Sequence, residues 1–342
     1  MSKNNLIFVG TIKKVVNCGE SMKNDIMLRR FGEVYDKVMV FNTWGAKTHP
    51  WWVFKLFYYL LFYPKAKIVV SATPYVAYDM IRFLDLLGKH NVYYWVIGGA
   101  LAQWLRDNNC DLKSYKKLKG IFVESPKMIQ ELEKLGIHGA VHVPNFKRIE
   151  YQPSIDNRQY DKVKFVFLSR VHQEKGCSLI VESVKHLNDL GYHDKFSVDF
   201  FGPIDPEYPE FLSSIEKVDN ISYKGFLKID NNGYDTLAQY NMMLFPTFWH
   251  NEGFPGVIID AFISGLPVLA SDWHFNSDLI DDTTGMIIPT NNQEALDNAM
   301  KKVIDGEIDL KALSENCRKK AMEYDDRTVL SIEHLKALKV LE

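Results

Sequence analysis

Short runs of apolar residues, many of them β-branched or aromatic, recur along almost the whole chain, and stretches with a helical period separate them. A continuous apolar run of this kind is typical of a strand that is buried on both faces. In the first half of the chain, these runs predict strands at 6–9, 37–41, 67–72, 92–97, 120–124 and 140–143. The helical period between the runs predicts helices at 25–31, 75–87 and 127–135.

The alternation pauses between 146 and 162, where the chain is polar, contains Pro153 and has no clear apolar period. It then resumes with strands predicted at 164–168, 197–201, 221–224, 242–245, 268–270 and 286–288. Helices are predicted at 178–190, 207–218, 234–240, 256–263 and 294–304. The last stretch of the chain is expected to be helical throughout, with a break near 324–326.

The pause divides the chain into two α/β domains, so we predict two doubly wound parallel sheets in tandem. The expected boundaries are a first domain at 1–148, a linker at 149–162, a second domain at 163–322 and a C-terminal helical segment at 323–342. No strand is predicted within or after that last segment, and we therefore expect it to cross back to the first domain. A length of 342 residues suffices for two separate cores.

Composition narrows the class of protein. A hydrophobic content of 46% and a charged content of 25% are ordinary for a globular chain. A net charge of -2 argues against a nucleic-acid-binding protein, which is usually strongly basic. The chain leads directly into the strand expected at 6–9 without a secretory signal, so a cytoplasmic location is expected. Widely spaced cysteines indicate reduced thiols and no structural zinc site: Cys18, Cys110, Cys177 and Cys317.

The most lipid-like stretch is 51–63, which is rich in Trp, Tyr and Phe but contains Lys55. It falls short of the ~20 apolar residues that a membrane-spanning helix needs. Its aromatic residues, with Lys65 and Lys67 close behind, fit a helix that lies in a membrane interface. A helix packed on the sheet of the first domain explains the same pattern, and the two are compatible if one face is exposed. With one face exposed, peripheral membrane contact is expected through the apolar positions Leu56, Phe57 and Leu60.

The segment 251–262 places two carboxylates, Glu252 and Asp260, around a glycine-rich start of an apolar helix. If Phe254 or Pro255 opens that helix, Glu252 precedes it and Asp260 lies about two turns in. The amides of a first helical turn have no intrahelical partner and carry the positive end of the helix dipole, which suits a phosphate. The segment therefore predicts a sugar-nucleotide site. Helix capping remains an alternative for Glu252, whereas an unpaired carboxylate at Asp260 would be costly to bury.

Two cations are expected on the same edge of the second sheet. Arg170 and Lys175 follow the strand predicted at 164–168, and the next helix is expected to begin near Gly176. Ligands of open α/β sheets bind beyond the carboxyl ends of strands. A planar guanidinium and a compact ammonium could clamp a diphosphate there. Ordinary surface cations could have the same spacing, and the presence of Glu252 in the same domain favours the binding site.

The second half resembles the retaining glycosyltransferases of family GT4, the glycosyl transferases group 1, which have the GT-B fold and use nucleotide-activated sugars. The resemblance rests on an ordered set of segments within 164–305, namely 169–176, 201–203, 252–261, 265–272 and 285–289. It implies an α/β protein of two Rossmann-like, doubly wound parallel-sheet domains that face a cleft, with a helical C-terminal tail. The first domain would serve the acceptor and the second would hold the nucleotide sugar.

The resemblance also implies roles for single residues. Arg170 and Lys175 would bind the donor diphosphate and stabilise charge on the leaving nucleotide, and Glu252 would position the donor sugar; these three are the expected catalytic residues. Asp260 stands where the family usually has glutamate and would hold the ribose hydroxyls with one methylene less of reach. The full set expected to bind the donor is Arg170, Lys175, Gly225, Phe226, Glu252, Gly253, Phe254, Gly256, Val257 and Asp260.

In the first domain the resemblance is thinner. Gly19 and Lys23 belong to the loop expected after the first strand, and they are candidates for contact with donor or acceptor. A plain loop with a solvated lysine fits those residues equally well. The family often supplies a histidine from this domain; His49 and His90 are available, and neither is assigned to the role.

The reaction implied is transfer of a sugar from a UDP- or GDP-sugar to a hydroxyl acceptor with retention at the anomeric carbon. No metal and no cofactor are expected, because no Asp-x-Asp signature follows a predicted strand and the nucleotide sugar is a substrate. A glycan or lipid-linked glycan acceptor in bacterial surface polysaccharide synthesis is the expected context. A nucleotide-sugar epimerase of related fold and a non-catalytic sugar-nucleotide-binding assembly partner remain alternatives. A dehydrogenase is disfavoured, since no Gly-x-Gly-x-x-Gly follows a predicted strand.

Overall fold

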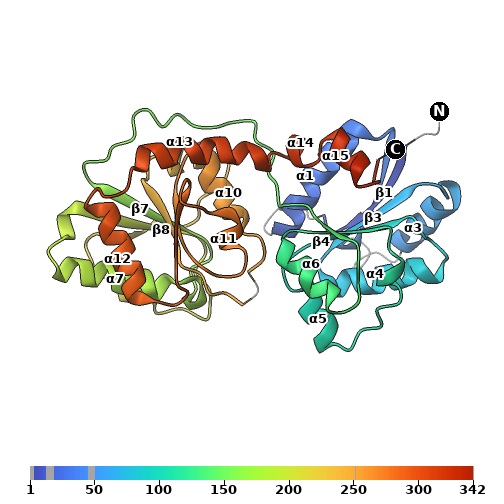
Figure 1. Cartoon of the computed structure of the whole chain (residues 1–342), viewed down its shortest axis with the longest axis horizontal. Helices are drawn as coiled ribbons and strands as arrows, with labels where there is room; N and C mark the ends of the chain where they lie inside the picture. Colours follow the sequence, from blue (N-terminus) through green and yellow to red (C-terminus); the bar gives the residue numbers. More distant parts are fainter. Residues whose placement is uncertain (1–3, 13–18, 45–50, 251, 342) are drawn as a thin grey trace. The chain divides into compact units, whose positions relative to one another are not determined.

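A computed structural model describes residues 4–12, 19–44, 51–250 and 252–341 (Figure 1). The chain forms two compact units. Unit 1 consists of Met1–Arg148 and Tyr324–Glu342, and unit 2 consists of Ile149–Glu323. Each unit contains a six-stranded sheet with flanking helices, and every paired strand runs parallel to its neighbour. The predicted class of two parallel α/β domains is confirmed.

The sheet of unit 1 contains the strands β1 (Asn5–Gly10), β2 (Lys37–Asn42), β3 (Lys67–Ala72), β4 (Val92–Val96), β5 (Gly120–Val123) and β6 (Ala140–His142). Their spatial order is β2-β1-β3-β4-β5-β6. Each strand lies where an apolar run predicts it. The reason is burial on both faces, which demands a continuous apolar sequence.

The helices of unit 1 are α1 (Gly19–Val34), α3 (Trp51–Phe62), α4 (Pro74–Leu86), α5 (Leu101–Asp107), α6 (Pro126–Glu133), α14 (Asp326–Val329) and α15 (Ile332–Ala337). The start of α6 has a clear local cause, because the Ser125 side chain accepts a hydrogen bond from the Lys127 amide and Pro126 occupies the first turn. Within the described ranges no helix has both the length and the apolar character required to cross a membrane.

One face of the first sheet carries an aromatic core, which includes Phe31, Trp95 and Phe122. The end of the chain completes this core with Val329, Leu330, Leu335, Leu338, Val340 and Leu341. The Tyr35 hydroxyl donates to the Val340 carbonyl at 2.5 Å in the same layer. The C-terminal segment is thus an integral part of unit 1.

The sheet of unit 2 contains the strands β7 (Val163–Leu168), β8 (Phe196–Phe201), β9 (Ile221–Tyr223), β10 (Met242–Phe245), β11 (Val268–Ser271) and β12 (Gly285–Ile288). Their order is β12-β11-β10-β7-β8-β9. The two strands whose loops carry the candidate chemistry, β7 and β10, are therefore direct neighbours, with Met242 of β10 paired with Phe165 of β7.

The helices of unit 2 are α7 (Cys177–Asp189), α8 (Phe211–Ile215), α9 (Asn231–Leu237), α10 (Gly256–Ile263), α11 (Asn276–Leu279), α12 (Gln293–Ile304) and α13 (Leu310–Ala321). The helix predicted at 207–218 is shortened to α8, because Pro209 cannot continue a helix and disfavours helical geometry at Tyr208. The helix predicted at 234–240 begins earlier, because the Asp230 side chain caps it by accepting from the Gly233 amide at 3.2 Å.

The segment 149–162, predicted to be a linker, belongs to unit 2. Its anchor is the buried Arg158, which donates to the carbonyls of Ala238 (2.7 Å), Ser264 (2.8 Å) and Gly265 (2.6 Å) and to the Ser314 hydroxyl (2.7 Å). Three of these acceptors lie just beyond α9 and α10, where helix carbonyls lack intrahelical partners and favour a cation. One arginine thus holds this polar segment against unit 2.

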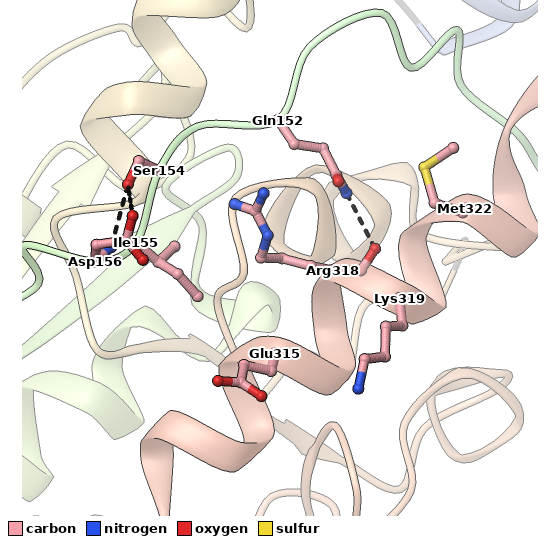
Figure 2. Close-up of a pocket in the computed structure, with 8 residues that line it drawn as sticks. All are labelled: Gln152, Ser154, Ile155, Asp156, Glu315, Arg318, Lys319 and Met322. Carbon is pink, nitrogen blue, oxygen red and sulfur yellow. Dashed lines mark hydrogen bonds between the residues drawn. The ribbon is translucent and has the colours of Figure 1, made fainter.

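The same segment runs beside α13 (Figure 2). The Gln152 side chain donates to the Arg318 carbonyl at 3.0 Å, as the dashed line in Figure 2 shows. Between segment and helix lies an open depression of about 650 Å³, lined by Gln152, Ser154, Ile155, Asp156, Glu315, Arg318, Lys319 and Met322. Its lining carries both signs of charge.

Candidate functional site

The loops after β7, β8 and β10 approach one another at the carboxyl edge of the second sheet. Two glycines permit this approach. At Gly176, with φ of +79°, a Cβ atom would lie 2.4 Å from the Pro246 carbonyl oxygen. At Gly202, with φ of +136°, it would lie 1.8 Å from the Ser169 carbonyl oxygen. Both positions therefore require glycine, and the edge they form is where open α/β sheets bind ligands.

Lys175 and Glu252 form an ion pair at this edge. The Lys175 ammonium nitrogen lies 2.5 Å from a Glu252 carboxylate oxygen, and the two side chains are only 12% and 11% exposed. The Thr247 hydroxyl donates to the same carboxylate oxygen at 3.0 Å. Two donors therefore fix the position of the Glu252 carboxylate. The pair offsets the cost of removing each charge from water.

The start of α10 distinguishes between the two roles considered for Glu252. The N-cap residue of α10 is Pro255, whose side chain makes no cap hydrogen bond. Glu252 is therefore not the cap. The first-turn residues Gly256 and Val257 are partly exposed, and Gly253 and Phe254 lie in the loop immediately before them. A helix start of this kind can accept an anion through its amides and its dipole.

The Trp249 ring lies close to the basic side chains of the loop after β7. The Lys175 ammonium lies 5.6 Å and the Arg170 guanidinium carbon 5.9 Å from the centre of its ring. The His172 ring meets it edge-on with centroids 4.9 Å apart. The Trp273 indole N–H donates to the Trp249 carbonyl at 2.8 Å and holds the loop. Sequence reasoning did not assign Trp249 a role; its place three residues before Glu252 was the available signal.

Arg170 does not contact Glu252 but pairs with Asp205, at 3.3 Å between side-chain nitrogen and oxygen. The Arg170 side chain is 55% exposed. The Glu207 amide, first, and the Arg170 guanidinium hold the pKa of the Asp205 carboxyl below its ordinary value. Because exposed ion pairs contribute little free energy, the guanidinium can exchange this partner for a ligand anion.

One group of side chains in the described parts of the chain has the composition of a metal site: His172, Asp205 and Glu207. The His172 Nδ1 atom, however, accepts a hydrogen bond from the Glu174 amide at 3.1 Å. That bond requires the neutral ring to carry its proton on Nε2, the atom that faces Glu207 at 3.7 Å. A metal ligand needs a free lone pair, so this hydrogen bond opposes metal binding by His172.

Asp260 is buried in α10 and has a partner. The Tyr234 hydroxyl of α9 donates to the Asp260 carboxylate at 3.1 Å. Burial, and then the negative charge of Asp260, raise the pKa of Tyr234 well above its ordinary value. Sequence reasoning missed Tyr234, because no local signal connects residues that lie 26 positions apart.

Gly225 and Phe226 follow β9. Gly225 has a φ of +76°, and its carbonyl accepts a hydrogen bond from the Gly202 amide at 2.9 Å. The Phe226 side chain is exposed. Both residues lie on the carboxyl edge of the sheet, two strands away from β7.

The candidates in unit 1 have different surroundings. Gly19 is the exposed first residue of α1. Lys23 lies within α1 rather than in the expected loop, and its buried side chain forms a salt bridge with the buried Glu124. The alternative of a solvated lysine in a loop is therefore wrong, because the helical period of α1 turns Lys23 inward. His90 precedes β4 at the amino edge of the sheet, whereas His49 lies outside the described residues.

Comparison with known proteins gives a family match for the second half of the chain. The family model described as "Glycosyl transferases group 1" matches residues 149–320, which is half of the chain. An uncharacterized glycosyltransferase of Methanocaldococcus jannaschii is 24% identical over 158 residues. That match covers 44% of this chain and 38% of the relative, so it spans well under half of the relative's length.

Two solved structures resemble the whole chain. A sucrose-phosphate synthase from Thermosynechococcus elongatus has a TM-score of 0.72 at 13% identity, with 98% of each chain covered. HepE of Anabaena, solved in complex with UDP, has a TM-score of 0.71 at 13% identity, with 99% of this chain and 100% of that chain covered. At such low identity the likeness concerns the fold, and it confirms the GT-B fold that the sequence resemblance implies.

Proposed function

The chain belongs to the family of glycosyl transferases group 1, and on that premise we propose that it transfers a sugar from a nucleoside-diphosphate donor to a hydroxyl acceptor. The donor would be a UDP- or GDP-sugar, and the anomeric configuration would be retained. The observation that carries the proposal is the Lys175–Glu252 pair at the carboxyl edge of the second sheet. The structure of HepE with UDP, a protein of similar fold, supports a nucleoside diphosphate as ligand.

Departure of the nucleotide leaves negative charge on its diphosphate. Lys175 and Arg170 flank the Trp249 ring, so both cations can approach one diphosphate bound there. The amides of Gly256 and Val257 at the start of α10, where Pro255 supplies no side-chain cap, would add hydrogen bonds and the positive end of a helix dipole. Fixed charges and dipoles that face the leaving group stabilise the transition state. These groups supply positive charge without a metal, and no cofactor is part of the proposal.

Glu252 would position the donor sugar. Its carboxylate is held by Lys175 and Thr247, which keeps it oriented. In a front-face attack, the acceptor hydroxyl reaches the anomeric carbon on the side that the diphosphate leaves, and a phosphate oxygen takes the hydroxyl proton. Glu252 then stabilises the developing positive charge on the sugar and need not bond to it.

The remaining donor contacts would come from the sides of the site. Asp260, oriented by Tyr234, would accept hydrogen bonds from the ribose hydroxyls. Gly225 and Phe226, at the end of β9, would contact the base. Gly253 and Phe254 would place the loop backbone near the sugar and its phosphate. Gly19, at the start of α1, remains a candidate for contact with donor or acceptor.

We place the reaction in bacterial surface polysaccharide synthesis, on a glycan or lipid-linked glycan acceptor at the inner face of the cell membrane. The support is the exposed aromatic face of α3 in unit 1. Free thiols at Cys110, Cys177 and Cys317 agree with a cytoplasmic enzyme. Burial raises the pKa of Cys177 to about 12, which makes that thiol unreactive.

The test is acceptor-dependent release of nucleoside diphosphate. A panel of nucleotide sugars is first screened by thermal shift, because a selective ligand stabilises the folded state. The selected donor is then incubated with and without hydroxyl acceptors. Release that requires an acceptor, together with retained configuration in the product, supports the transferase. Conversion of the donor without acceptor indicates the epimerase, and binding without either reaction indicates the assembly partner.

The site is tested with Glu252→Gln, which keeps the size of the side chain and removes its charge. The matched control is Glu182→Gln, which alters a surface pair with Lys185 on α7. Acceptor-dependent release should be abolished in the first variant and unchanged in the control. Undiminished release by a folded Glu252→Gln protein would refute the site.

A further inference from the structure

The outward face of α3 is apolar, which reverses the usual pattern of a surface helix. Leu56 and Leu60 point inward and are buried. The outward positions follow a spacing of three and four residues, so they form one stripe along the helix. This stripe consists of Trp51 (78% exposed), Phe54 (66%), Tyr58 (51%), Leu61 (73%) and Phe62 (62%).

The stripe differs from the positions expected from sequence. Leu56 and Leu60 are 1% and 5% exposed, and Phe57 packs edge-on against Phe83 of α4 with ring centroids 5.7 Å apart. Those three side chains attach α3 to unit 1. Burial contradicts the expected membrane contact of Leu56 and Leu60, whereas Phe57 is still 44% exposed. An almost uniformly apolar helix has no periodic signal that identifies its buried face.

A second element extends the apolar surface. The turn after α4 is tied to α3 by Lys89, whose ammonium donates to the Leu60 carbonyl at 3.1 Å. Leu86, at the end of α4, is 84% exposed. We call the outward residues of α3 together with Leu86 the apolar patch. Contiguous exposed apolar surface of this kind marks an interaction site.

Charge along α3 is basic, and Asp85, the neighbour of Leu86 on α4, is paired with Lys117 at 2.9 Å. Residues 37–78 contain five lysines and no aspartate or glutamate. Lys55 on α3 and Lys65 just after it are exposed, and Lys37 lies beside Tyr63 with 2.6 Å between ammonium nitrogen and hydroxyl oxygen. Basic residues around exposed Trp, Tyr, Phe and Leu are complementary to an anionic lipid surface.

We propose that the apolar patch docks the chain on an anionic lipid bilayer, with α3 lying in the plane of the interface. The helix has 12 residues, too few to cross the hydrocarbon core. Trp51, Tyr58 and the lysines would lie at headgroup depth, and Phe54, Leu61 and Phe62 would reach the acyl boundary. The inference rests on the membrane location proposed above and assigns it to one face of unit 1.

The experiment is sedimentation of the full chain with vesicles, without any nucleotide sugar. One set of vesicles is phosphatidylcholine, and the other is an equal mixture of phosphatidylcholine and phosphatidylglycerol. Phe54→Ser/Leu61→Ser changes the apolar patch without touching the buried side of α3. Leu190→Ser/Leu212→Ser removes two exposed leucines of unit 2 and is the matched control. Lys55→Gln/Lys65→Gln tests the charge.

We expect the native chain and the control to bind the mixed vesicles, and Phe54→Ser/Leu61→Ser to bind them about tenfold more weakly or worse. The lysine variant should lose its preference for mixed over neutral vesicles. Thermal unfolding verifies that each variant is folded. Transfer to a water-soluble acceptor should not change, so failure of the vesicle assay and failure of the proposed reaction remain distinct.

Three outcomes would overturn the inference. The native chain does not sediment with either kind of vesicle; the apolar variant binds as tightly as the native chain; or both double-serine variants lose binding equally. A different result would show that a second copy of the chain covers the apolar patch instead. In that case the native chain is dimeric in solution and does not bind vesicles, and Phe54→Ser/Leu61→Ser is monomeric.

Discussion

The ammonium of Lys175 and the carboxylate of Glu252 lie 2.5 Å apart although 77 positions separate the two residues in sequence. The contact exists because β7 and β10 are neighbours in the sheet. The loop after each strand delivers one charge to the same edge. The pair joins the two candidate segments of the sequence into one site. Its contribution to the free energy of unfolding and its contribution to turnover can be measured separately.

Removal of both charges should cost less stability than the two single changes predict. In Lys175→Met or Glu252→Gln, one charge or polar group stays largely buried without its partner, at a cost of about 1–3 kcal/mol. In the double variant neither charge remains, so the free energies of unfolding should not add. Urea unfolding measures all three. Turnover should fall about 100-fold or more in each, and additive stabilities would show that the two side chains are not coupled.

Asp260→Asn should weaken donor binding more than it slows the reaction. The amide keeps the shape of the side chain but has only one oxygen that can accept a hydrogen bond from the ribose hydroxyls. The KM for the donor should therefore rise about tenfold while kcat changes little. Tyr234→Phe should have the same effect to a smaller degree, because it removes the hydrogen bond that orients the carboxylate.

Tyr240→Phe is the control for that pair. The Tyr240 hydroxyl donates to Asp199 at 2.7 Å, a tyrosine–aspartate contact that does not involve α10. This variant should lose stability without a change in the donor KM. An equal rise in KM in Tyr240→Phe would mean that Tyr234 acts only through general stability.

Gly176→Ala should be far more harmful than Gly191→Ala, although both glycines have positive φ. At Gly191 an added Cβ meets nothing within 4 Å, so the cost is the backbone strain of about 1 kcal/mol. At Gly176 the Cβ would clash with the Pro246 carbonyl and force the β7 and β10 loops apart. Thermal unfolding and turnover together test this, and equal losses in the two variants would contradict the close approach of the loops.

His186 should titrate above its ordinary pKa. The Asp297 carboxylate hydrogen-bonds its imidazole at 2.7 Å and raises the pKa of the ring. A folded pKa above the unfolded value favours the folded state fully below the unfolded pKa, about 6.5. That stabilisation is lost as pH rises through the folded pKa. NMR titration should show the raised pKa in the native chain and an ordinary one in Asp297→Asn.

The strands were predictable because their burial on both faces leaves a continuous apolar run in sequence, as in Lys67–Ala72. The start of α6 at Pro126 is also a local feature, because Ser125 caps the helix and proline suits its first turn. The rule that ligands bind beyond the carboxyl ends of strands placed Lys175 and Glu252 at one edge of the sheet, but their direct contact depends on β7 and β10 being neighbours, which sequence does not give.

The features that could not be predicted from sequence depend on contacts between residues that lie far apart in the chain. Lys23 was expected in a loop, but Glu124 binds it in the interior of unit 1 from 101 positions away. Tyr234 reaches Asp260 from another helix. On α3 the inward and outward faces are equally apolar, so only packing against Phe83 and the sheet distinguishes them.

Residues 329–341 complete the core of unit 1, so this core cannot close before they are synthesised. The core around Phe31 and Trp95 stays open until Leu330, Leu335 and Val340 emerge from the ribosome, whereas unit 2 is one continuous piece that ends at Glu323. The half of the chain that is made first is therefore finished last. A chain interrupted after Glu323 would therefore contain a complete second unit attached to a first unit with an exposed aromatic core.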